Sequence, residues 1–257
     1  RYNNKLNLMK NMLNISKEHL EVFKQIKNYF LPSTKIPKPD NWKSLTNNDI
    51  WFHVVKQVMV VGSSAPAEKF DKNSELQSLI SYEKLLKIDD ESELRDYFEQ
   101  VLRAVGSLFP NRKADALVHN LKKLSGFQDG PKGLLKRISE IDGPDIRRIK
   151  YLIKQDLKYI KNRGARDFLM DLGIVRDAVA LDARIKNIFE KIGIHLPEEF
   201  IGKAKLYDEI EKEILTKICK PIELSGVEFD RMLYQNYDKI NLFLEKKVIQ
   251  QILEPYF

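Results

Sequence analysis

Apolar residues recur at intervals of three or four along most of this chain. In the segment 20–30, Leu20, Phe23, Ile26 and Phe30 follow this spacing. An α-helix has about 3.6 residues per turn, so residues spaced in this way fall on one face. The spacing therefore predicts an all-α protein made of about ten or more short helices. Further segments with the same spacing are 94–105, 117–124 and 185–192.

Prolines and glycines separate the predicted helices. Three prolines between 32 and 39 end the first helix, because proline has no amide proton and disfavours the α conformation in the residue before it. The next helix should begin near Asn48 or Asp49 and end at Gly62. Its many valines leave a β-strand as the alternative for this segment.

The cysteine and histidine content excludes several kinds of site. Cys219 is the only cysteine, so the chain can form neither an intrachain disulfide nor a four-cysteine zinc site or iron–sulfur cluster. The four histidines include no pair at the four-residue spacing that places two imidazoles on one helical face. We therefore expect no metal and no cofactor, and a fold that depends on packing in a reducing compartment.

The distribution of apolar residues also predicts the location of the protein in the cell. No apolar run approaches the roughly 20 residues that cross a membrane. The first twenty residues contain no apolar stretch of signal-peptide length. We expect a cytoplasmic monomer without membrane contact, associated with the nucleoid if the source is prokaryotic.

Positive charge is concentrated in one segment. The whole chain has a formal net charge of +7. The segment 145–166 contains eight basic and two acidic residues and so contributes +6 by itself. Such a cluster suits a phosphate backbone, because each neutralised phosphate releases condensed counterions. The alternative is a solvated helix face, since an apolar stripe runs through the same segment.

A carboxylate follows a short apolar run and precedes a predicted helix. Asp182 comes directly after Ala-Val-Ala-Leu, and the apolar spacing of a helix starts at Ile185. Asp182 is therefore expected to cap that helix, where backbone amides and the helix dipole stabilise a negative charge. It can face a cleft and carry chemistry, or it can be a structural cap only.

The order of these elements resembles that of the helix-hairpin-helix DNA glycosylase superfamily. Members share a helix, a tight hairpin, a second helix that ends in glycine, and an apolar turn into a catalytic aspartate. The matching segments here are IKYLIKQDLKYI, KNR, GARDFLMDLG and AVALDARIKNIFEKIGI. Two earlier segments, NDIWFHVVKQVMVVGSSA and ADALVHNLKKLSGF, resemble the family's early and central helices. The segment GVEFDRMLYQ is similar to that of archaeal 8-oxoguanine glycosylases, which lack the iron–sulfur cluster.

This resemblance implies an all-α fold of two lobes with a cleft between them. One lobe would consist of residues 1–61 and 183–257, and the other of residues 62–182. The helix-hairpin-helix would span about residues 145–173 of the second lobe.

The resemblance also implies base excision repair. The chain would bind double-stranded DNA, flip out a damaged base such as 8-oxoguanine and break its N-glycosidic bond. Asp182 would stabilise the positive charge that develops on the deoxyribose. The expected DNA contacts of the hairpin are Lys158, Lys161, Asn162, Arg163, Gly164 and Arg166. The expected residues of the base pocket are Trp51, Phe52, Asp230 and Tyr234. Core packing of Tyr234 and capping by Asp230 explain those two residues equally well, and aromatic residues at helical spacing, such as Trp51 and Phe52, are more often part of the core.

Two positions in the hairpin depart from the family pattern. Tyr159 and Lys161 stand where the family usually has glycines. Arg163 stands where members with AP-lyase activity have the lysine that forms a Schiff base, and a guanidinium cannot lose its proton to become a nucleophile. Lys161 is the nearest substitute for that lysine, with a phosphate contact as its alternative role. The lyase step is therefore left open.

Other functions are compatible with the same pattern. The chain could be a non-catalytic DNA-binding or damage-sensing protein on the glycosylase fold. It could also be a glycosylase for uracil or thymine mismatches or for alkylated bases. A third alternative is a helical interaction module whose basic face binds an acidic protein partner.

Overall fold

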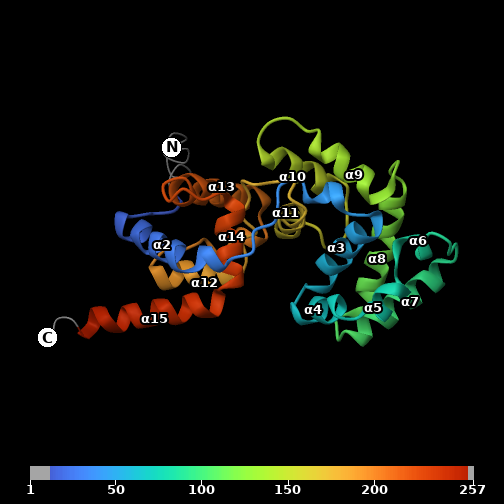
Figure 1. Ribbon diagram of the computed structural model, residues 1–257, viewed down its shortest axis with the longest axis horizontal. Helices are drawn as coiled ribbons and strands as arrows, with labels where there is room; N and C mark the ends of the chain where they lie inside the picture. Colours follow the sequence, from blue (N-terminus) through green and yellow to red (C-terminus); the bar gives the residue numbers. More distant parts are fainter. Residues whose placement is uncertain (1–11, 254–257) are drawn as a thin grey trace. The chain divides into compact units, whose positions relative to one another are not determined.

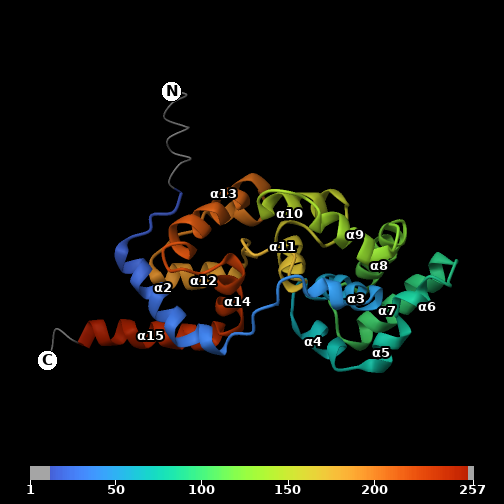
Figure 2. The same cartoon turned by 45° about the horizontal axis from the view of Figure 1, so that its top comes forward.

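The computed structural model describes the chain from residue 12 to residue 253, and Figures 1 and 2 show it from two directions. Every regular element in this range is helical, which confirms the predicted all-α class. None of the described helices is both long and apolar enough to span a bilayer. The chain divides into two compact units, of which one is continuous in sequence and the other is not.

The continuous unit comprises residues 38–175 and is organised around helix α3. Helix α3, Asn47–Met59, contacts α4, α6, α8, α9 and α11. Trp51 and Val55 on α3 are completely buried. The other elements of this unit are η2 (Asn41–Ser44), α4 (Ala65–Asp71), α5 (Ser74–Leu79), α6 (Tyr82–Leu85), α7 (Glu91–Ala104), α8 (Pro110–Ser125), α9 (Gly130–Ser139), α10 (Asp145–Lys154) and α11 (Asn162–Asp171).

The discontinuous unit combines the segment up to Pro37 with the segment from Arg176 onward. At its centre the rings of Phe23, Phe189 and Phe229 pack against one another with centroids 5.4–6.3 Å apart. Helix α12 contacts both α14 and α15. The elements of this unit are α2 (Lys17–Phe30), η1 (Leu31–Ser33), α12 (Ala183–Ile192), η3 (Glu198–Ile201), α13 (Ala204–Ile214), the π-helical turn η4 (Leu215–Cys219), α14 (Gly226–Gln235) and α15 (Tyr237–Leu253).

The unit boundaries differ from those expected from the sequence. The chain divides near residues 37 and 175, not near residues 61 and 182. Helix α3 lies in the continuous unit because its apolar face is buried against α8 and α9. The segment leading to Asp182 lies in the discontinuous unit, where side chains of α13 and α14 bind its backbone.

The segment with many valines is a helix, not the alternative strand. Helix α3 begins after Thr46, slightly earlier than the predicted cap at Asn48 or Asp49. The Thr46 hydroxyl accepts a hydrogen bond from the Asp49 amide at 3.1 Å, and the Asp49 carboxylate accepts one from the Thr46 amide at 2.8 Å. This reciprocal capping box satisfies two amides that the helix itself leaves unpaired.

A buried lysine closes the other end of α3. Lys113 is 1% exposed, and its ammonium donates to the carbonyls of Met59 and Val61 at 3.1 and 2.9 Å and to the Ser107 hydroxyl at 3.0 Å. Burial lowers the pKa of Lys113. The ammonium ties α8 to the end of α3, because it binds carbonyls that have no partner within the helix.

Replacement of this lysine should destabilise the continuous unit. Lys113→Met keeps much of the side-chain volume but leaves two buried acceptors and one partly buried acceptor without a donor, so we expect a loss of about 3 kcal/mol in the free energy of unfolding. Urea titration followed by tryptophan fluorescence measures this loss, because both tryptophans, Trp42 and Trp51, lie in this unit. The control is Lys123→Met, an exposed lysine on the same helix, and equal stability of the two variants would contradict the expectation.

Candidate nucleic-acid interface and catalytic carboxylate

Helices α10 and α11 form a hairpin whose turn contains two residues with positive φ. These are Asp156 at 57° and Tyr159 at 66°. Tyr159 thus keeps the left-handed backbone that a glycine would adopt, although the conformation costs a side-chain-bearing residue about 1–2 kcal/mol. Lys161, at the second expected glycine position, has an extended backbone that any residue can adopt.

Glycine is needed elsewhere in the hairpin. A Cβ atom at Gly164 would lie 3.0 Å from the carbonyl oxygen of Tyr159. Helix α11 therefore packs closely on the turn at this point. The helix is followed by Gly173, whose φ of 69° fits the predicted glycine end of the second hairpin helix.

Helix α8 fixes the conformation of the turn. The Asn120 side chain is completely buried, donates to the Lys158 carbonyl at 3.1 Å and accepts from the Lys158 amide at 2.6 Å. His119 Nε2 lies 2.9 Å from the Asp156 carbonyl, which can only accept, so this nitrogen carries the proton. Three hydrogen bonds from one helix thus hold the hairpin, and nothing in the sequence pattern indicated them.

The basic residues of the hairpin differ in whether another side chain of the protein already pairs with them. Lys158 Nζ lies 2.8 Å from a carboxylate oxygen of Asp156, and this hydrogen bond lowers the pKa of the Asp156 carboxyl. Lys161 is exposed, and its ammonium has no hydrogen-bond or ion-pair partner among the described residues. Asn162, Arg163 and Gly164 form the partly exposed first turn of α11.

Arg166 does not take the position expected of a phosphate contact. Its side chain is completely buried, and Nη1 donates to the carbonyl of Asn162 at 2.9 Å. The prediction for this residue is wrong because its side chain is buried and binds the backbone of its own helix instead of facing solvent.

The start of α11 has no capping side chain. The first amides of an α-helix have no acceptor within the helix, and no side chain caps α11 at Lys161. The positive end of the helix dipole lies at the same place. Together with Lys161, this end of the helix is suited to bind a phosphate.

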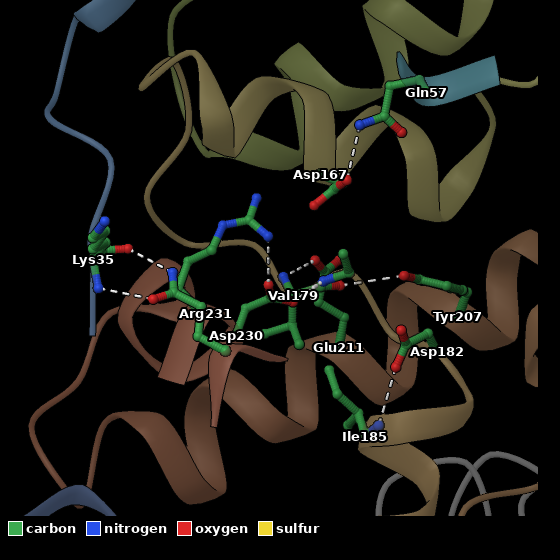
Figure 3. A network of polar contacts seen from close by, with 12 residues as sticks. Lys35, Gln57, Asp167, Val179, Asp182, Ile185, Tyr207, Glu211, Asp230 and Arg231 are labelled. Carbon is green, nitrogen blue, oxygen red and sulfur yellow. Dashed lines mark hydrogen bonds and ion pairs between the residues drawn. The ribbon is translucent and has the colours of Figure 1, made fainter. Parts of the chain in front are cut away.

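Asp182 caps α12, as the sequence predicted. One carboxylate oxygen, Oδ1, accepts from the amides of Arg184 at 2.9 Å and Ile185 at 3.0 Å. Figure 3 shows the contact with Ile185. The side chain is partly exposed. These two hydrogen bonds fix the orientation of a carboxylate that is still within reach of solvent.

Two buried carboxylates hold the extended segment that leads to Asp182. Glu211 Oε1 accepts from the Val179 amide at 2.9 Å, and Asp230 Oδ1 accepts from the Ala180 amide at 2.7 Å (Figure 3). The Tyr207 hydroxyl lies 3.3 Å from the Val179 carbonyl. A buried extended segment that is not in a sheet needs such partners, because unpaired backbone groups are costly to bury.

This geometry corrects the role predicted for Asp230. Asp230 is 2% exposed, binds the Ala180 amide and pairs with Arg231 at 3.2 Å. It therefore supports the backbone near Asp182 and does not line an open pocket. Glu211 also binds a backbone amide of this segment, but it was not predicted. The sequence of an amphipathic helix does not show that one of its glutamates is buried.

The remaining residues predicted for a base pocket lie in different surroundings. Trp51 is completely buried in the core of the continuous unit, and its indole N–H donates to the Ile80 carbonyl at 2.9 Å, so its predicted pocket role is wrong. Phe52 packs edge-on against Phe70. Tyr234 is partly exposed, and the guanidinium of Arg184 lies 4.6 Å above its ring.

An exposed apolar pair precedes α8. Leu108 and Phe109 are 51% and 65% exposed. Phe109 has a φ of 54° and stands directly before Pro110. A large apolar pair held in solvent by a strained backbone was not anticipated, because the sequence shows only a short break between two helices.

The fold and the hairpin define the class of structure. The described residues adopt an all-α fold that is shared with solved 8-oxoguanine DNA glycosylases. Among the described residues, no three histidine, cysteine, aspartate or glutamate side chains are grouped so as to hold a metal ion.

Particular solved structures share this fold. The 8-oxoguanine DNA glycosylase of Thermotoga maritima is 20% identical and superposes with a TM-score of 0.55, over 91% of this chain and 96% of that chain. The 8-oxoguanine glycosylase/lyase of Methanocaldococcus jannaschii, solved with a 15mer DNA containing 8-oxoguanine, is 18% identical with a TM-score of 0.58, over 92% and 97% of the two chains.

Curated sequences give a consistent result over a shorter range. The 8-oxoguanine DNA glycosylase/AP lyases of Thermotoga petrophila and Thermotoga maritima are each 29% identical to this chain over 135 residues, which is 52% of this chain. The matched region spans 58% of the length of these relatives. No protein family model matches the chain.

The support of the Asp182 segment can be tested without DNA. Glu211→Ala removes the acceptor of the Val179 amide, so we expect hydrogen exchange at Val179 to become about tenfold faster or more, with a loss of about 1–3 kcal/mol in unfolding free energy. Glu211→Gln retains an oxygen acceptor and should keep most of the protection. The control is Glu209→Ala, a more exposed glutamate on the same helix, and unchanged exchange in Glu211→Ala would contradict the assigned role.

Proposed function

We propose that this chain is a DNA N-glycosylase of base excision repair that removes an oxidised purine such as 8-oxoguanine from double-stranded DNA. One observation carries the proposal: Asp182 caps α12 at the end of a rigidly held extended segment, in a fold shared with 8-oxoguanine glycosylases. Such an enzyme works where the chromosome is, in the cytoplasm or nucleoid, and needs only one copy of the chain.

Asp182 supplies the electrostatic part of the reaction. Breaking the N-glycosidic bond leaves positive charge on the deoxyribose as the electron pair moves to the departing base. A carboxylate fixed beside that sugar stabilises the charge and can orient the attacking water. The two amides that bind Oδ1 hold the group in place, so little reorganisation is needed when the charge develops.

The hairpin supplies the contact with the DNA backbone. The backbone amides at the start of α11, which no side chain caps, and the ammonium of Lys161 would bind a phosphate, with Asn162 and Gly164 in the same turn. Lys158 adds positive charge beside them, partly neutralised by Asp156. Contacts of this kind fix the position of the duplex without reading its sequence.

Two aromatic features are suited to handling the bases. Tyr234, beside the first turn of α12, offers a ring on which a flipped base can stack. The exposed pair Leu108 and Phe109 is suited to enter the base stack and fill the space that a flipped base leaves, as apolar wedges do in proteins that unstack DNA. Phe52 has no comparable exposure because it packs on Phe70.

Excision assays test the proposal. Single-lesion duplexes carrying 8-oxoguanine, uracil, hypoxanthine or alkylated adenine are incubated with the protein and then treated with alkali. We expect alkali-labile sites at 8-oxoguanine, with a single-turnover rate that falls about 100-fold or more in Asp182→Asn. Asp89→Asn, an exposed acid outside both the hairpin and the α12 region, is the control and should keep the wild-type rate.

Other outcomes favour other functions. Cleavage at uracil or at an alkylated base alone would identify a different glycosylase. Tight binding of lesion duplexes without any excision would favour the non-catalytic damage-sensing protein. An Asp182→Asn variant as active as the wild type would refute the role of this carboxylate.

The lyase step is tested separately, because the curated relatives are named as AP lyases and this chain has Arg163 at the expected lysine position. We expect no covalent trapping of the wild type on DNA with borohydride, because a guanidinium does not form a Schiff base. Arg163→Lys should introduce trapping, and Arg163→Gln should not. Wild-type trapping that disappears in Lys161→Gln would instead assign the amine to Lys161.

A further inference from the structure

A groove of about 730 Å³ lies between the hairpin and α8, within the continuous unit. Its volume falls in the range of about 300–1,000 Å³ that is usual for sites of small ligands. Hydrogen bonds between the Asn120 side chain and the Lys158 backbone join its two walls, so its shape is fixed by the fold. The lining residues are Arg112, Asp115, Ala116, His119, Lys158, Tyr159 and Lys161.

The groove carries positive charge that other side chains do not neutralise. Asp115 is paired with Arg95 at 2.7 Å, and Lys158 is paired with Asp156 at 2.8 Å. The exposed Arg112 and Lys161 have no hydrogen-bond or ion-pair partner in the part of the chain that the structure describes. One of these two cations comes from α8 and the other from the hairpin, so an anion in the groove can be reached from both walls.

Tyr159 lines this groove with a backbone conformation that has an energetic cost. Its φ of 66° is a conformation that favours glycine, so the side chain is retained against the backbone preference. No other aromatic ring packs on it among the described residues. Strained residues of this kind are often kept for a function, and Tyr159 lines the groove and is only partly buried.

We propose that the groove binds an unpaired nucleotide of a DNA strand, with the base stacked on Tyr159 and the phosphate held by Arg112 and Lys161. Proteins that hold single-stranded nucleic acid combine a basic groove with an aromatic ring on which a base stacks. A duplex backbone alone would use the two cations but would leave the ring without a partner. The inference rests on the DNA binding that the proposed function requires, and it adds a preference for DNA that has an unpaired nucleotide near the hairpin.

Binding assays with two lesion-free duplexes test this preference. One duplex is fully paired, and the other carries a single unpaired 2-aminopurine; both have a fluorescein label. Fluorescence anisotropy should show about tenfold tighter binding of the duplex with the unpaired residue. The emission of 2-aminopurine should fall on binding, because stacking on the tyrosine ring quenches it.

Tyr159→Gly is the decisive variant. It removes the ring but suits the positive φ, so the hairpin is expected to fold at least as well as in the wild type. Its preference for the unpaired residue should fall to about twofold or less, while its affinity for the paired duplex stays within about twofold of the wild type. Tyr159→Phe keeps the ring and should keep the preference. Arg112→Gln should weaken binding of the unpaired duplex, whereas Lys87→Gln, at an exposed lysine outside the groove, should not.

The outcomes separate this proposal from the glycosylase proposal. Equal affinity for the two duplexes, or a preference that survives in Tyr159→Gly, would overturn the groove site whether or not the chain excises 8-oxoguanine. A preference that depends on Tyr159 in a chain that excises no lesion would support the groove and contradict the proposed enzyme. If neither duplex binds, binding of a labelled oligothymidine is measured instead. Binding that is lost in Tyr159→Gly would support the groove site, and a wild type that does not bind the oligothymidine would overturn it.

Discussion

The candidate active site depends on the way buried carboxylates hold a short piece of extended backbone. Between Val179 and Leu181 the chain runs through the interior without a strand beside it, so its amides need acceptors from elsewhere. Glu211 and Asp230 provide them from two different helices. Because Asp182 directly follows this segment, its position is set by α13 and α14 as much as by α12, which it caps. A site built in this way holds one carboxylate rigidly while leaving it partly exposed.

The turn of the hairpin is likewise held by polar side chains of another helix. Hydrogen bonds from Asn120 and His119 define the turn between α10 and α11. This support from α8 explains how a tyrosine is kept at a backbone conformation that favours glycine. In both places, buried or partly buried polar side chains from a neighbouring helix form the hydrogen bonds that fix the backbone. In other proteins a sheet or a glycine-rich turn fixes the backbone instead.

The helical class, the cap at Asp182 and the hairpin could be predicted from the sequence because each depends on local spacing and capping chemistry. The positions of Trp51, Arg166 and Asp230 could not, because the sequence does not show which face of a helix meets its neighbours. Tryptophan suits a core and a base pocket equally well, and a basic residue in a basic segment can still point inward. Glu211 and Asn120 were missed for the same reason: their partners are backbone groups at least 32 residues away.

The interrupted connectivity of the two units has a consequence for the order of folding during synthesis. All residues of the continuous unit, from 38 to 175, are synthesised before α12, α13 and α14. The helix-hairpin-helix can therefore fold early, since domains generally fold as units while the chain grows. The segment 12–37 must wait for the C-terminal helices on which it packs. The unit that carries the hairpin is thus complete in synthesis before Asp182 has its supports, and a chain truncated before α14 would retain the hairpin without a positioned Asp182.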